Sequence, residues 1–462
     1  MKQRTIKSNI SITGFGIHTG VLTNITLIPA KSDSGIRFIR TDLAGNPIIE
    51  AIVDNVVSTR RSTDLKKANA EIRTVEHLLA AVSGFSIDNL IIEVDNIEVP
   101  ILDGSAKVFS KLISQSGVIE LNKERKYYEI KRKISLRDNE TGTILTAIPS
   151  EDYKINVKID YNSKTLGVQE ASLESISDFN NKISSSRTFC FLHELETLVE
   201  DNLIKGGDLN NAIVVVEKEI TKEKLKKLGK IFNKSDIKVT KRGTLNNLTL
   251  RHDNEPARHK LLDVVGDLSL LGRPIKGKIS AIKPGHKNNI KFAKYLKNIM
   301  LEDMKKTAPE INLNDIPLYD KEKIKTILPH REPFLLIDEI REIGDDYITG
   351  VKFVKEDEDY FRGHFPNEPV MPGVLQLETM AQAGGVLILS TVENPENYLT
   401  FFMKIDNAKF KKKVIPGNIL IFRLNLISPI RRGLCHMHGK GFVDGEIVVE
   451  ADLLAQIAPK EK

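Results

Sequence analysis

The sequence predicts an α+β protein in which helices and strands are mixed along both halves of the chain. Apolar and polar residues alternate as in strands in each half, at KINVKID (154–160) and at ILIFRLNLI (419–427). Helical spacing of apolar residues also occurs in each half, at TVEHLLAAV (74–82) and at PGVLQLETMAQAGGVL (372–387). The 462 residues suffice for about three domain-sized units, each able to bury a core.

The clearest boundary along the chain is the polar segment LEDMKKTAPEINLNDIPLYD, which carries Pro309 and Pro317 and lacks sustained periodicity. This composition is typical of a linker. A weaker break, NKERKYYEIKR (122–132), divides the part before it. We therefore predict a first part over 1–300 with sub-units at about 1–126 and 127–300, a linker at 301–320, and a second part over 321–462.

The composition excludes several classes of protein. The longest apolar runs, GGVLILS and NLIIEV, are far too short to cross a bilayer, and the first residues lack the apolar region of a signal peptide. Two cysteines, Cys190 and Cys435, are too few for a disulfide scaffold. With a net charge of only +6, no Trp and 6% aromatic residues, the chain lacks the features of a nucleic-acid-binding module. We expect a cytoplasmic protein with no membrane span and no nucleic-acid partner.

A lysine-rich stretch, KEKLKKLGKIF, requires a different interpretation from nucleic-acid binding. Its apolar residues Leu225, Leu228, Ile231 and Phe232 stand at helical spacing. We interpret it as an ordinary amphipathic helix with a solvated, basic face.

The stretch HKLLDVVGDL (259–268) contains a candidate pair of metal ligands. His259 and Asp263 are four residues apart in a segment with helical apolar spacing, so their side chains should share one face. An imidazole and a carboxylate one turn apart can be two ligands of zinc, which takes nitrogen and oxygen ligands. A surface His and a surface Asp produce the same pattern, and the pair alone favours that plainer interpretation.

A third ligand is available in TVEHLLAA, where Glu76 stands beside His77 at the start of an apolar helical run. His77 would complete a set of three ligands, and Glu76 would add a carboxylate able to take a proton. Three protein ligands leave one position for water, which distinguishes catalytic from structural zinc. The sequence thus allows a hydrolytic metal centre, although a lone EH pair carries little weight.

Further motifs extend this hypothesis over the whole first part. They are GFGIHTG (14–20), ILDGSA (101–106), SSRTF (185–189), GGDLNNAIVV (206–215), DNEPARHKLLDVVGDL (253–268) and KPGHKNN (283–289). With them, the first 300 or so residues resemble the zinc-dependent UDP-3-O-(3-hydroxyacyl)-N-acetylglucosamine deacetylases of lipid A synthesis, over the full length of that family. The resemblance implies two similar α+β units, each a layer of helices against a sheet, with zinc between them.

The same resemblance implies a metal site and a base. His77, His259 and Asp263 hold one Zn²⁺ per chain, and Glu76 takes the proton of the zinc-bound water as it attacks the acetamide carbonyl. For His18 of GFGIHTG we expect a structural or supporting role rather than a catalytic one.

Four further residues complete the implied deacetylase site. The Thr188 hydroxyl and the Lys260 ammonium, together with zinc, stabilise the oxyanion. His286 protonates the leaving amine, and Asp267 keeps its imidazole charged for that purpose.

The second part carries a different chemistry. Its motifs ILPHREPFLLIDEI, YFRGHFPNEPVMPGVLQLETMAQAGG and FKKKVIPGNIL contain no metal-ligand spacing, but they place a His before a helix with Pro372 in its first turn. Glu378 is the sole acid in the apolar run of that helix, which Leu375, Leu377, Met380 and Ala381 would bury. Either Glu378 has a functional role, or it lies on an exposed stripe.

From about residue 320 to the end, the chain resembles the 3-hydroxyacyl-ACP dehydratases (ACP, acyl carrier protein), which have the hot-dog fold. The resemblance implies that His364 of GHFP removes the proton α to the thioester carbonyl and that Glu378 protonates the departing 3-hydroxyl. The backbone N–H of Gly373, at the start of the helix, is implied to hold the thioester oxygen. No cofactor is implied for this part. Asn418 departs from the PGD turn expected in the family.

The two resemblances predict a bifunctional enzyme, both a zinc-dependent amide hydrolase and a carbon–oxygen lyase. Its expected partners are UDP-3-O-acyl-N-acetylglucosamine and acyl carrier protein bearing 3-hydroxyacyl chains. Because the dehydratase family pairs two protomers, so that the His of one chain faces the Glu of the other, we expect a homo-oligomer, either a dimer or a hexamer. A non-catalytic acyl-binding or oligomerising module and a thioesterase of the same fold are the alternatives for the second part. The presence of both His364 and Glu378 argues against the first of these.

Overall fold

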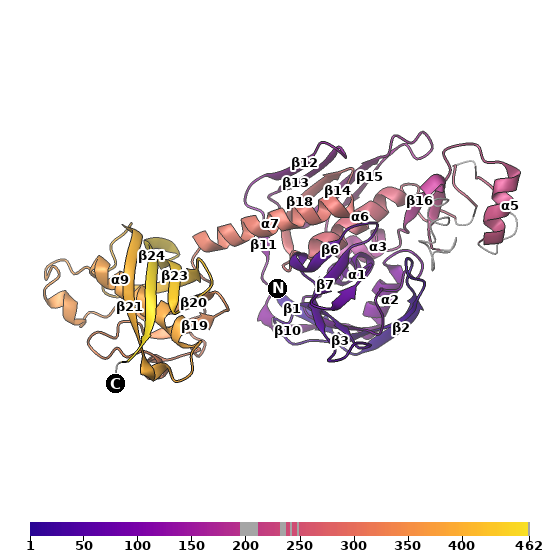
Figure 1. Cartoon of the computed structure of the whole chain (residues 1–462). Helices are drawn as coiled ribbons and strands as arrows, with labels where there is room; N and C mark the ends of the chain where they lie inside the picture. The colour runs from indigo at the N-terminus through magenta and orange to yellow at the C-terminus, as the bar shows by residue number, and fades with distance from the viewer. Residues whose placement is uncertain (195–210, 232–236, 241–242, 247–248, 461–462) are drawn as a thin grey trace. The chain divides into compact units, whose positions relative to one another are not determined.

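The computed structural model describes two compact units. They comprise Met1–Met300 and Leu301–Lys462 (Figure 1). The described residues are 1–194, 211–231, 237–240, 243–246 and 249–460. None of the helices within these ranges is long and apolar enough to span a membrane.

The first half of the N-terminal unit is built on a five-stranded sheet in the order β2-β3-β9-β4-β5. Neighbouring strands pair antiparallel, except that β4 and β9 run parallel. The strands are β2 (Ile10–Phe15), β3 (Leu22–Pro29), β4 (Ile36–Arg40), β5 (Ile48–Glu50) and β9 (Leu90–Val94). Helix α1 (Glu76–Gly84) precedes β9, and helix α2 (Lys107–Ser116) follows it.

The second half repeats this arrangement strand for strand. Its sheet has the order β12-β13-β18-β14-β15, again antiparallel except for the parallel pair β14–β18. The strands are β12 (Ile134–Asp138), β13 (Thr143–Ile148), β14 (Tyr153–Asp160), β15 (Val168–Leu173) and β18 (Ile275–Ile282). Helix α6 (Glu255–Ser269) precedes β18, and α7 (His286–Lys306) follows it. The expected pair of similar helix-on-sheet units is therefore confirmed by strand order, although no internal sequence repeat reveals it.

Smaller elements complete the N-terminal unit. Two pairs of short strands are β1 (Lys2–Ile6) with β10 (Val118–Glu124) and β16 (Phe189–Phe191) with β17 (Ile213–Val215). A three-stranded ribbon consists of β6 (Val56–Ser58), β7 (Asp64–Lys67) and β8 (Ala70–Ile72). Strand β11 (Tyr128–Glu129) lies beside β18. The remaining helices are α3 (Phe179–Lys182) and the predicted amphipathic α5 (Lys222–Ile231), from which Leu225 and Leu228 pack into a small apolar cluster. Phe232 and residues 206–210 of the GGDLNNAIVV motif lie outside the described residues.

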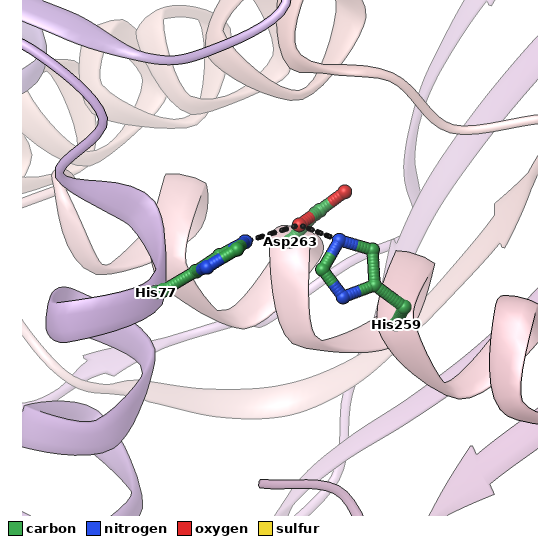
Figure 2. A group of neighbouring side chains, drawn as sticks. All are labelled: His77, His259 and Asp263. Carbon is green, nitrogen blue, oxygen red and sulfur yellow. Dashed lines mark ion pairs between the residues drawn. The ribbon is translucent and has the colours of Figure 1, made fainter. Parts of the chain in front are cut away.

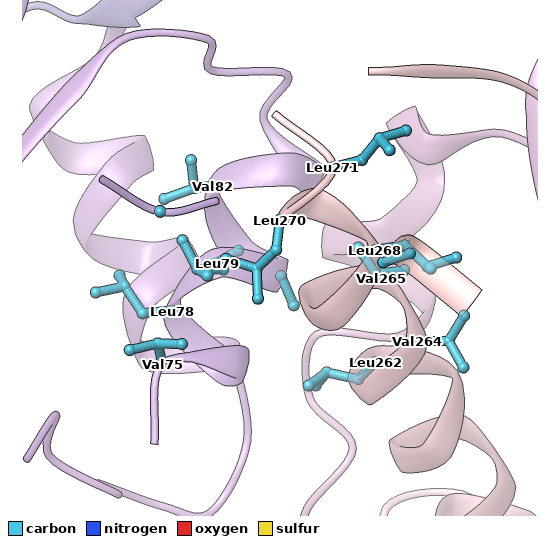
Figure 3. Close-up of a cluster of buried hydrophobic side chains, with 14 of the residues drawn as sticks. Val75, Leu78, Leu79, Val82, Leu262, Val264, Val265, Leu268, Leu270 and Leu271 are labelled. Carbon is cyan, nitrogen blue, oxygen red and sulfur yellow. The ribbon is translucent and has the colours of Figure 1, made fainter. Parts of the chain in front are cut away.

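Helices α1 and α6 occupy equivalent places in the two halves and pack against each other. Figure 3 shows the buried apolar side chains of this contact, such as Leu79 and Val82 of α1 and Val265 and Leu268 of α6. The helices approach closely at Gly266, where an added Cβ would overlap the backbone carbonyl of Glu76. A glycine at this point lets the two backbones meet, so residues at the start of α1 face the middle of α6.

The C-terminal unit is a six-stranded antiparallel sheet in the order β19-β20-β22-β23-β24-β21, wrapped on one long helix, α9 (Gly373–Leu389). Close packing of α9 on the sheet depends on Gly439, where an added Cβ would overlap the Met380 sulfur. The strands are β19 (Glu339–Ile343), β20 (Tyr347–Phe353), β21 (Tyr398–Phe410), β22 (Ile419–Leu426), β23 (Leu434–Val443) and β24 (Glu446–Pro459). A short helix, α8 (Lys321–Ile327), precedes the sheet. This arrangement is the hot-dog fold that the resemblance implied.

The structure differs from the sequence prediction in two details. The linker predicted over 301–320 begins inside a helix, because α7 continues to Lys306, and its second half is held by the C-terminal unit. Arg341 donates hydrogen bonds to the carbonyls of Leu313 and Asp315, at 3.2 and 2.5 Å. Pro372 does not lie in the first turn of α9 but caps it in an extended conformation, and the helix begins at Gly373.

Candidate functional site

The centre of the N-terminal unit is a group of buried polar residues supplied by two helices. Glu76 and His77 begin α1, where they follow the turn that ends the β6–β8 ribbon. His259, Asp263 and Asp267 lie one turn apart along α6. All five residues are at most 5% exposed. Because α1 and α6 are each apolar on their other faces, burying these helices carries the polar residues into the interior.

Three of these residues form a candidate metal centre. His77, His259 and Asp263 offer ligand atoms that all lie within 4.8 Å of one another. Figure 2 shows both imidazoles directed at Asp263, whose Oδ1 lies 3.9 Å from His77 Nε2 and 3.4 Å from His259 Nε2. Asp263 Oδ1 is buried and has no hydrogen-bond partner among the described residues. A buried carboxylate oxygen without a hydrogen bond, facing two imidazole nitrogens, suits a cation that takes mixed N and O ligands.

The surroundings keep these three side chains in their metal-binding forms. His259 Nδ1 lies 3.1 Å from the Ser186 carbonyl, an acceptor that holds the ring proton on Nδ1 and leaves Nε2 free. Burial, together with the neighbouring His259, lowers the pKa of His77 to about 3, so its imidazole is neutral. Burial acts to raise the pKa of Asp263, but His259 and Lys260 outweigh it and hold that pKa well below its usual range. Neutral imidazoles and an ionised carboxylate are the forms that ligate metal.

An acid–base pair flanks the candidate metal centre. His286, the first residue of α7, places Nδ1 2.9 Å from Asp267 Oδ2 and Nε2 3.9 Å from Glu76 Oε1. Burial raises the pKa of Glu76 to about 8. Burial acts to lower the pKa of His286, but the carboxylates of Asp267 and Asp263 outweigh it and raise that pKa to about 10. The structure thus brings together a carboxyl group and a charged imidazole whose pKa values are shifted by different surroundings. Acid–base catalysis uses pairs of titratable groups of this kind.

The two predicted oxyanion donors lie at this site in different ways. Lys260 Nζ is 2.9 Å from Asp263 Oδ2 and 5.6 Å from the centre of the Phe189 ring, which in turn lies edge-on to His259. Thr188 is fixed through its backbone, because its N–H donates to Gly104 O at 2.8 Å and its carbonyl accepts from Ile213 N–H at 2.9 Å. Lys260 follows His259 on α6, and Thr188 directly precedes Phe189, whose ring contacts His259.

The C-terminal unit contains a second group of polar residues, at the start of α9. Glu378, 18% exposed at its side chain, lines an apolar cavity together with His330 and Gln382. Its Oε1 accepts from Gln382 Nε2 at 2.9 Å and lies 3.5 Å from His330 Nε2. Glu378 thus does not lie on an exposed stripe. His364 follows a short 3-10 helix, and its Nδ1 lies 2.7 Å from the Val370 carbonyl.

His364 and Glu378 do not line a common cavity within one chain. Residues 321–460 are all described, and His364 is not among those that line the cavity of Glu378. Gly373 stands at the first position of α9, where an added Cβ would press against the Phe410 ring. The Asn418 turn is intact, because Asn418 Oδ1 accepts from Ile415 N–H at 2.9 Å, as an Asp carboxylate could.

Comparison with known proteins agrees with this division into two sites. The family described as LpxC, UDP-3-O-acyl N-acetylglycosamine deacetylase, matches residues 3–229 and 223–298. The family described as the FabA-like domain matches residues 328–452.

Full-length relatives carry both parts in one chain. The protein named bifunctional enzyme LpxC/FabZ from Porphyromonas gingivalis is 46% identical over 456 residues, which cover 99% of this chain and 98% of that protein. Proteins of the same name from Bacteroides thetaiotaomicron and Chlorobaculum tepidum are 45% and 40% identical, each over 99% of both chains. The chain belongs to the bifunctional LpxC/FabZ family. Both family resemblances seen in the motifs are confirmed, and the chain is a bifunctional enzyme with a hydrolase part and a lyase part.

Two residues of the LpxC part were missed by sequence reasoning. Thr63, in the turn before β7, donates its N–H to Glu76 Oε2 at 3.0 Å and its hydroxyl to Asp267 Oδ1 at 2.6 Å. Glu98, fully buried, accepts from the backbone N–H groups of His18 and Thr19, at 3.0 and 2.8 Å, and from the Thr74 hydroxyl at 2.9 Å. Nothing in the sequence marks Thr63, whereas Glu98 could have been noticed as the acid in an apolar stretch, the signal that drew attention to Glu378.

Glu98 explains the GFGIHTG motif of the LpxC part. Its carboxylate accepts hydrogen bonds from the backbone of the loop of residues 16–20 and so fixes that loop. An added Cβ at Gly16 would overlap the carboxylate. His18 is held there by its backbone, and burial lowers the pKa of its imidazole. Because Thr74 lies two residues before Glu76, the same carboxylate also fixes the entry to α1.

Proposed function

We propose that the N-terminal unit hydrolyses the N-acetyl group of UDP-3-O-(3-hydroxyacyl)-N-acetylglucosamine and that the C-terminal unit dehydrates 3-hydroxyacyl-ACP to trans-2-enoyl-ACP. Family membership supports both activities. The observation that carries the first is the convergence of Glu76, His286 and the three candidate ligands from three helices. For the second it is the partly buried Glu378 at the cavity along α9.

The N-terminal unit would hold Zn²⁺ through His77, His259 and Asp263, one ion per chain. The donor set of two imidazoles and a carboxylate fits zinc, and the free Asp263 Oδ1 supports a cation at this point. When bound, zinc supplies a lowered pKa for a coordinated water and polarises a carbonyl oxygen.

The chain's own residues supply the proton transfers of amide hydrolysis. Glu76 acts as the base that takes a proton from the attacking water, and a cation beside it favours its carboxylate form despite burial. His286, held by Asp267, gives a proton to the amine nitrogen as the C–N bond breaks. Lys260 and Thr188 donate to the oxyanion that forms on the acetyl carbonyl.

The dehydratase reaction is a 1,2-elimination of water. His364 takes the proton from the carbon α to the thioester carbonyl, and the C–H electron pair forms the double bond. Glu378 protonates the 3-hydroxyl, which leaves as water when the C–O bond breaks. The N–H of Gly373, at the positive end of the 17-residue helix α9, stabilises the charge that develops on the thioester oxygen.

Each dehydratase site would be shared by two protomers. His364 lies outside the Glu378 cavity of its own chain, which supports a site completed by a second copy. Strand β21 is the free edge of the sheet and exposes Phe401, Met403 and Phe410 by half or more of their surface. Pairing of two such edges would cover them and yield a dimer, and three dimers would yield a hexamer. Acyl carrier protein is the proposed macromolecular partner of this unit, and the cytoplasm the proposed location.

The purified chain allows both activities to be tested directly. Acetate release from UDP-3-O-acyl-N-acetylglucosamine tests the hydrolase, and the hydration of crotonyl thioesters tests the dehydratase. Thioester hydrolysis without hydration would favour a thioesterase, and neither reaction would favour a non-catalytic module. No acetate release from the zinc-loaded chain would overturn the deacetylase assignment.

A further inference from the structure

Thr63 contacts both halves of the acid–base machinery at once. The residue is completely buried in the turn between β6 and β7. Its backbone N–H donates to Glu76 Oε2 at 3.0 Å, and its hydroxyl donates to Asp267 Oδ1 at 2.6 Å. The same hydroxyl oxygen lies 3.4 Å from His286 Nδ1.

We propose that Thr63 is a positioning residue of the deacetylase reaction, which fixes the base Glu76 and the Asp267–His286 pair relative to each other. The inference rests on the proposed function, because it takes the roles of Glu76 and His286 from there. The hydrogen bonds of Thr63 go to Glu76 and Asp267, neither of which is a candidate metal ligand. It acts through the two carboxylates that it binds.

Each bond of Thr63 selects which carboxylate oxygen faces the site. Asp267 Oδ2 accepts from Asn289 Nδ2 at 2.8 Å and lies 2.9 Å from His286 Nδ1. The Thr63 hydroxyl on the other oxygen prevents this carboxylate from turning and carrying the imidazole with it. At Glu76 the Thr63 N–H occupies Oε2, so that Oε1 is the oxygen directed towards His286 Nε2, 3.9 Å away. A displacement of less than an ångström at either group would misalign a proton transfer.

The hydroxyl can be removed without changing the shape of the side chain. Thr63→Val keeps the volume and the backbone N–H bond to Glu76 but leaves Asp267 Oδ1 without its donor, whereas Thr63→Ser keeps the donor. Ser62→Ala is the matched control, because Ser62 is as deeply buried in the same turn and its hydroxyl donates to Asp64 instead, at 2.8 Å. The dehydratase activity of the same chain reports whether each preparation is intact.

Deacetylase kcat and KM are measured for the zinc-loaded full-length variants, together with metal content and thermal unfolding. We expect Thr63→Val to lower kcat roughly 10- to 100-fold, the size expected for a lost hydrogen bond to a buried charge. Its KM and zinc content should stay near those of the parent chain, whereas its thermal stability should fall modestly, because a buried carboxylate oxygen loses its donor. Thr63→Ser should recover most of kcat, and Ser62→Ala should retain it.

Several outcomes would overturn the positioning role. Unchanged kcat in Thr63→Val removes it outright, and loss of zinc in parallel with kcat makes the role merely structural. If Thr63→Val does not fold, Thr63→Ala is compared with Thr63→Ser, and equal kcat values contradict the proposal. Glu76→Gln and His286→Gln are measured alongside. If these two variants lose activity and Thr63→Val does not, only the Thr63 inference fails, whereas unchanged activity in all three means that the proposed function fails.

An independent observation in the C-terminal unit concerns His330 of the LPHREPF motif. Its Nε2 lies 3.5 Å from Glu378 Oε1, the oxygen to which Gln382 donates at 2.9 Å. Its Nδ1 is buried without a hydrogen-bond partner among the described residues, and its ring stacks on Phe334. Burial lowers the pKa of His330, so its imidazole carries one proton.

We infer that His330 is a positioning residue for Glu378 and that it presents Oε2 of that carboxyl group to the substrate. A buried N–H without an acceptor is costly, so the single ring proton belongs on Nε2, directed at Glu378 Oε1. Gln382 donates to Oε1 at 2.9 Å, and the His330 N–H faces the same oxygen from 3.5 Å. The acidic proton of Glu378 is left on Oε2, where it can be given to the leaving hydroxyl. This inference rests on the proposed dehydratase role of Glu378.

Two substitutions of His330 distinguish the effect of its N–H donor from the effect of its ring. His330→Gln retains an N–H donor at a similar reach, and His330→Leu removes it. We expect His330→Leu to lower the kcat for crotonyl thioester hydration about 10-fold with little change in KM, and His330→Gln to recover part of it. Two controls accompany these variants. The first is the deacetylase activity of the same chain. The second is His438→Leu, because the imidazole of His438 pairs with Asp452 outside the cavity.

Full activity in His330→Leu, or equal losses in the Leu and Gln variants, would contradict the inference. Glu378→Gln is assayed in parallel. Retained hydration in that variant would instead overturn the proposed role of Glu378 itself.

Discussion

Asp263 organises the deacetylase site through its two oxygens. Oδ1 faces the imidazoles of His77 and His259, while Oδ2 lies 2.9 Å from the Lys260 ammonium and 3.9 Å from His286 Nε2. A carboxylate buried to this degree costs several kcal/mol unless positive partners surround it. Lys260 compensates one oxygen, and a metal ion is the partner that the other oxygen lacks.

Removal of one ligand tests the metal centre. We predict that the parent chain binds about one zinc ion and that His77→Ala loses both the metal and the deacetylase activity. Metal analysis of the purified variant, with activity assays of both units, measures this. The dehydratase should be unaffected, and His252→Ala, which removes an imidazole outside the donor set, should keep its zinc. Full metal occupancy with full activity in His77→Ala would exclude this site.

Variants of the proposed base and acid should behave differently from the variant that lacks a metal ligand. Glu76→Ala and His286→Ala should each keep zinc but lower the deacetylase kcat by at least ~100-fold, as expected for loss of a general base or acid. Because the two groups act in one proton-transfer sequence, the double variant should lose less than the product of the single losses. Steady-state kinetics checks both points. An effect of His286→Ala on KM alone would exclude proton donation and favour a phosphate-binding role.

The contact between α1 and α6 determines whether the ligands meet. Gly266 stands between Asp263 and Asp267 on α6, at the point where the backbone of Glu76 crosses. The Glu76 carbonyl cannot move aside as a flexible side chain could. The separation of these two helices is therefore determined by a missing methyl group.

We predict that Gly266→Ala forces α1 and α6 apart and lowers both zinc content and deacetylase activity, the latter at least ~10-fold, because His77 is carried away from His259 and Asp263. Gly285→Ala is the control, since a methyl group there meets no atom within 4 Å. Metal analysis and kcat/KM for the two variants measure the effect. Wild-type zinc content in Gly266→Ala would show that the contact between α1 and α6 can accommodate a methyl group, which contradicts the prediction.

A buried ion pair joins the start of α6 to the segment that leads into β16. Arg187 donates to both oxygens of Glu255, and the N–H groups of Arg187 and Arg251 donate to the same carboxylate. Burial acts to raise the pKa of Glu255, but these bonds outweigh it and place that pKa below the usual 4.5. The pair therefore aligns Thr188 and Ser186 with His259 on α6.

This pair predicts a pH-dependent stability. Since the folded pKa of Glu255 is lowered, its stabilisation is present above pH 4.5 and is lost as the pH falls through the lower folded value. Glu255→Gln should cost about 3 kcal/mol near pH 7, as expected when one partner of a buried pair is removed. The loss should shrink as the pH falls below 4.5 towards the lower folded pKa. Denaturant unfolding at several pH values, followed through deacetylase activity, measures it, and an equal loss at every pH would contradict the argument.

The whole molecule carries one self-contained site and one proposed shared site. Glu76, His77, His259, Asp263 and His286 all lie in the unit Met1–Met300, so the deacetylase needs no second chain. His364 does not line the cavity of Glu378 in the same chain, and the apolar edge of β21 is exposed. Oligomer formation should therefore matter to one activity and not to the other.

Subunit mixing tests this difference. Chains with His364→Ala and chains with Glu378→Gln should each lack dehydratase activity, and mixing them under conditions of subunit exchange should restore part of it, because some mixed dimers hold one intact pair. Truncation after Lys306, the end of α7, should leave a monomeric and active deacetylase. Native mass measurements accompany both experiments. No recovery after demonstrated exchange, together with activity in isolated monomers, would contradict a shared site.

Local sequence pattern was sufficient to predict the helices and strands that carry the site residues. The spacing of apolar residues predicts α1, α6 and α9 and the strands β14 and β22, because each element must bury one face. The lone acid in an apolar run marked Glu378, and the motifs that resemble known families supplied the remaining site residues. The last six residues of α7 overlap the predicted linker, since polar composition does not distinguish a helix end from a loop.

By itself the sequence determined which side chains share a face of one helix, as His259 and Asp263 do, because that depends only on the 3.6-residue period. Tertiary structure alone decided that His77 meets them, that Thr63 bonds to both Glu76 and Asp267, and that the cavity of Glu378 is lined without His364. The physical reason is that such contacts depend on how closely separate elements pack. A glycine at the α1–α6 crossing and a threonine in a turn leave no periodic trace, yet they set the distances on which the chemistry depends.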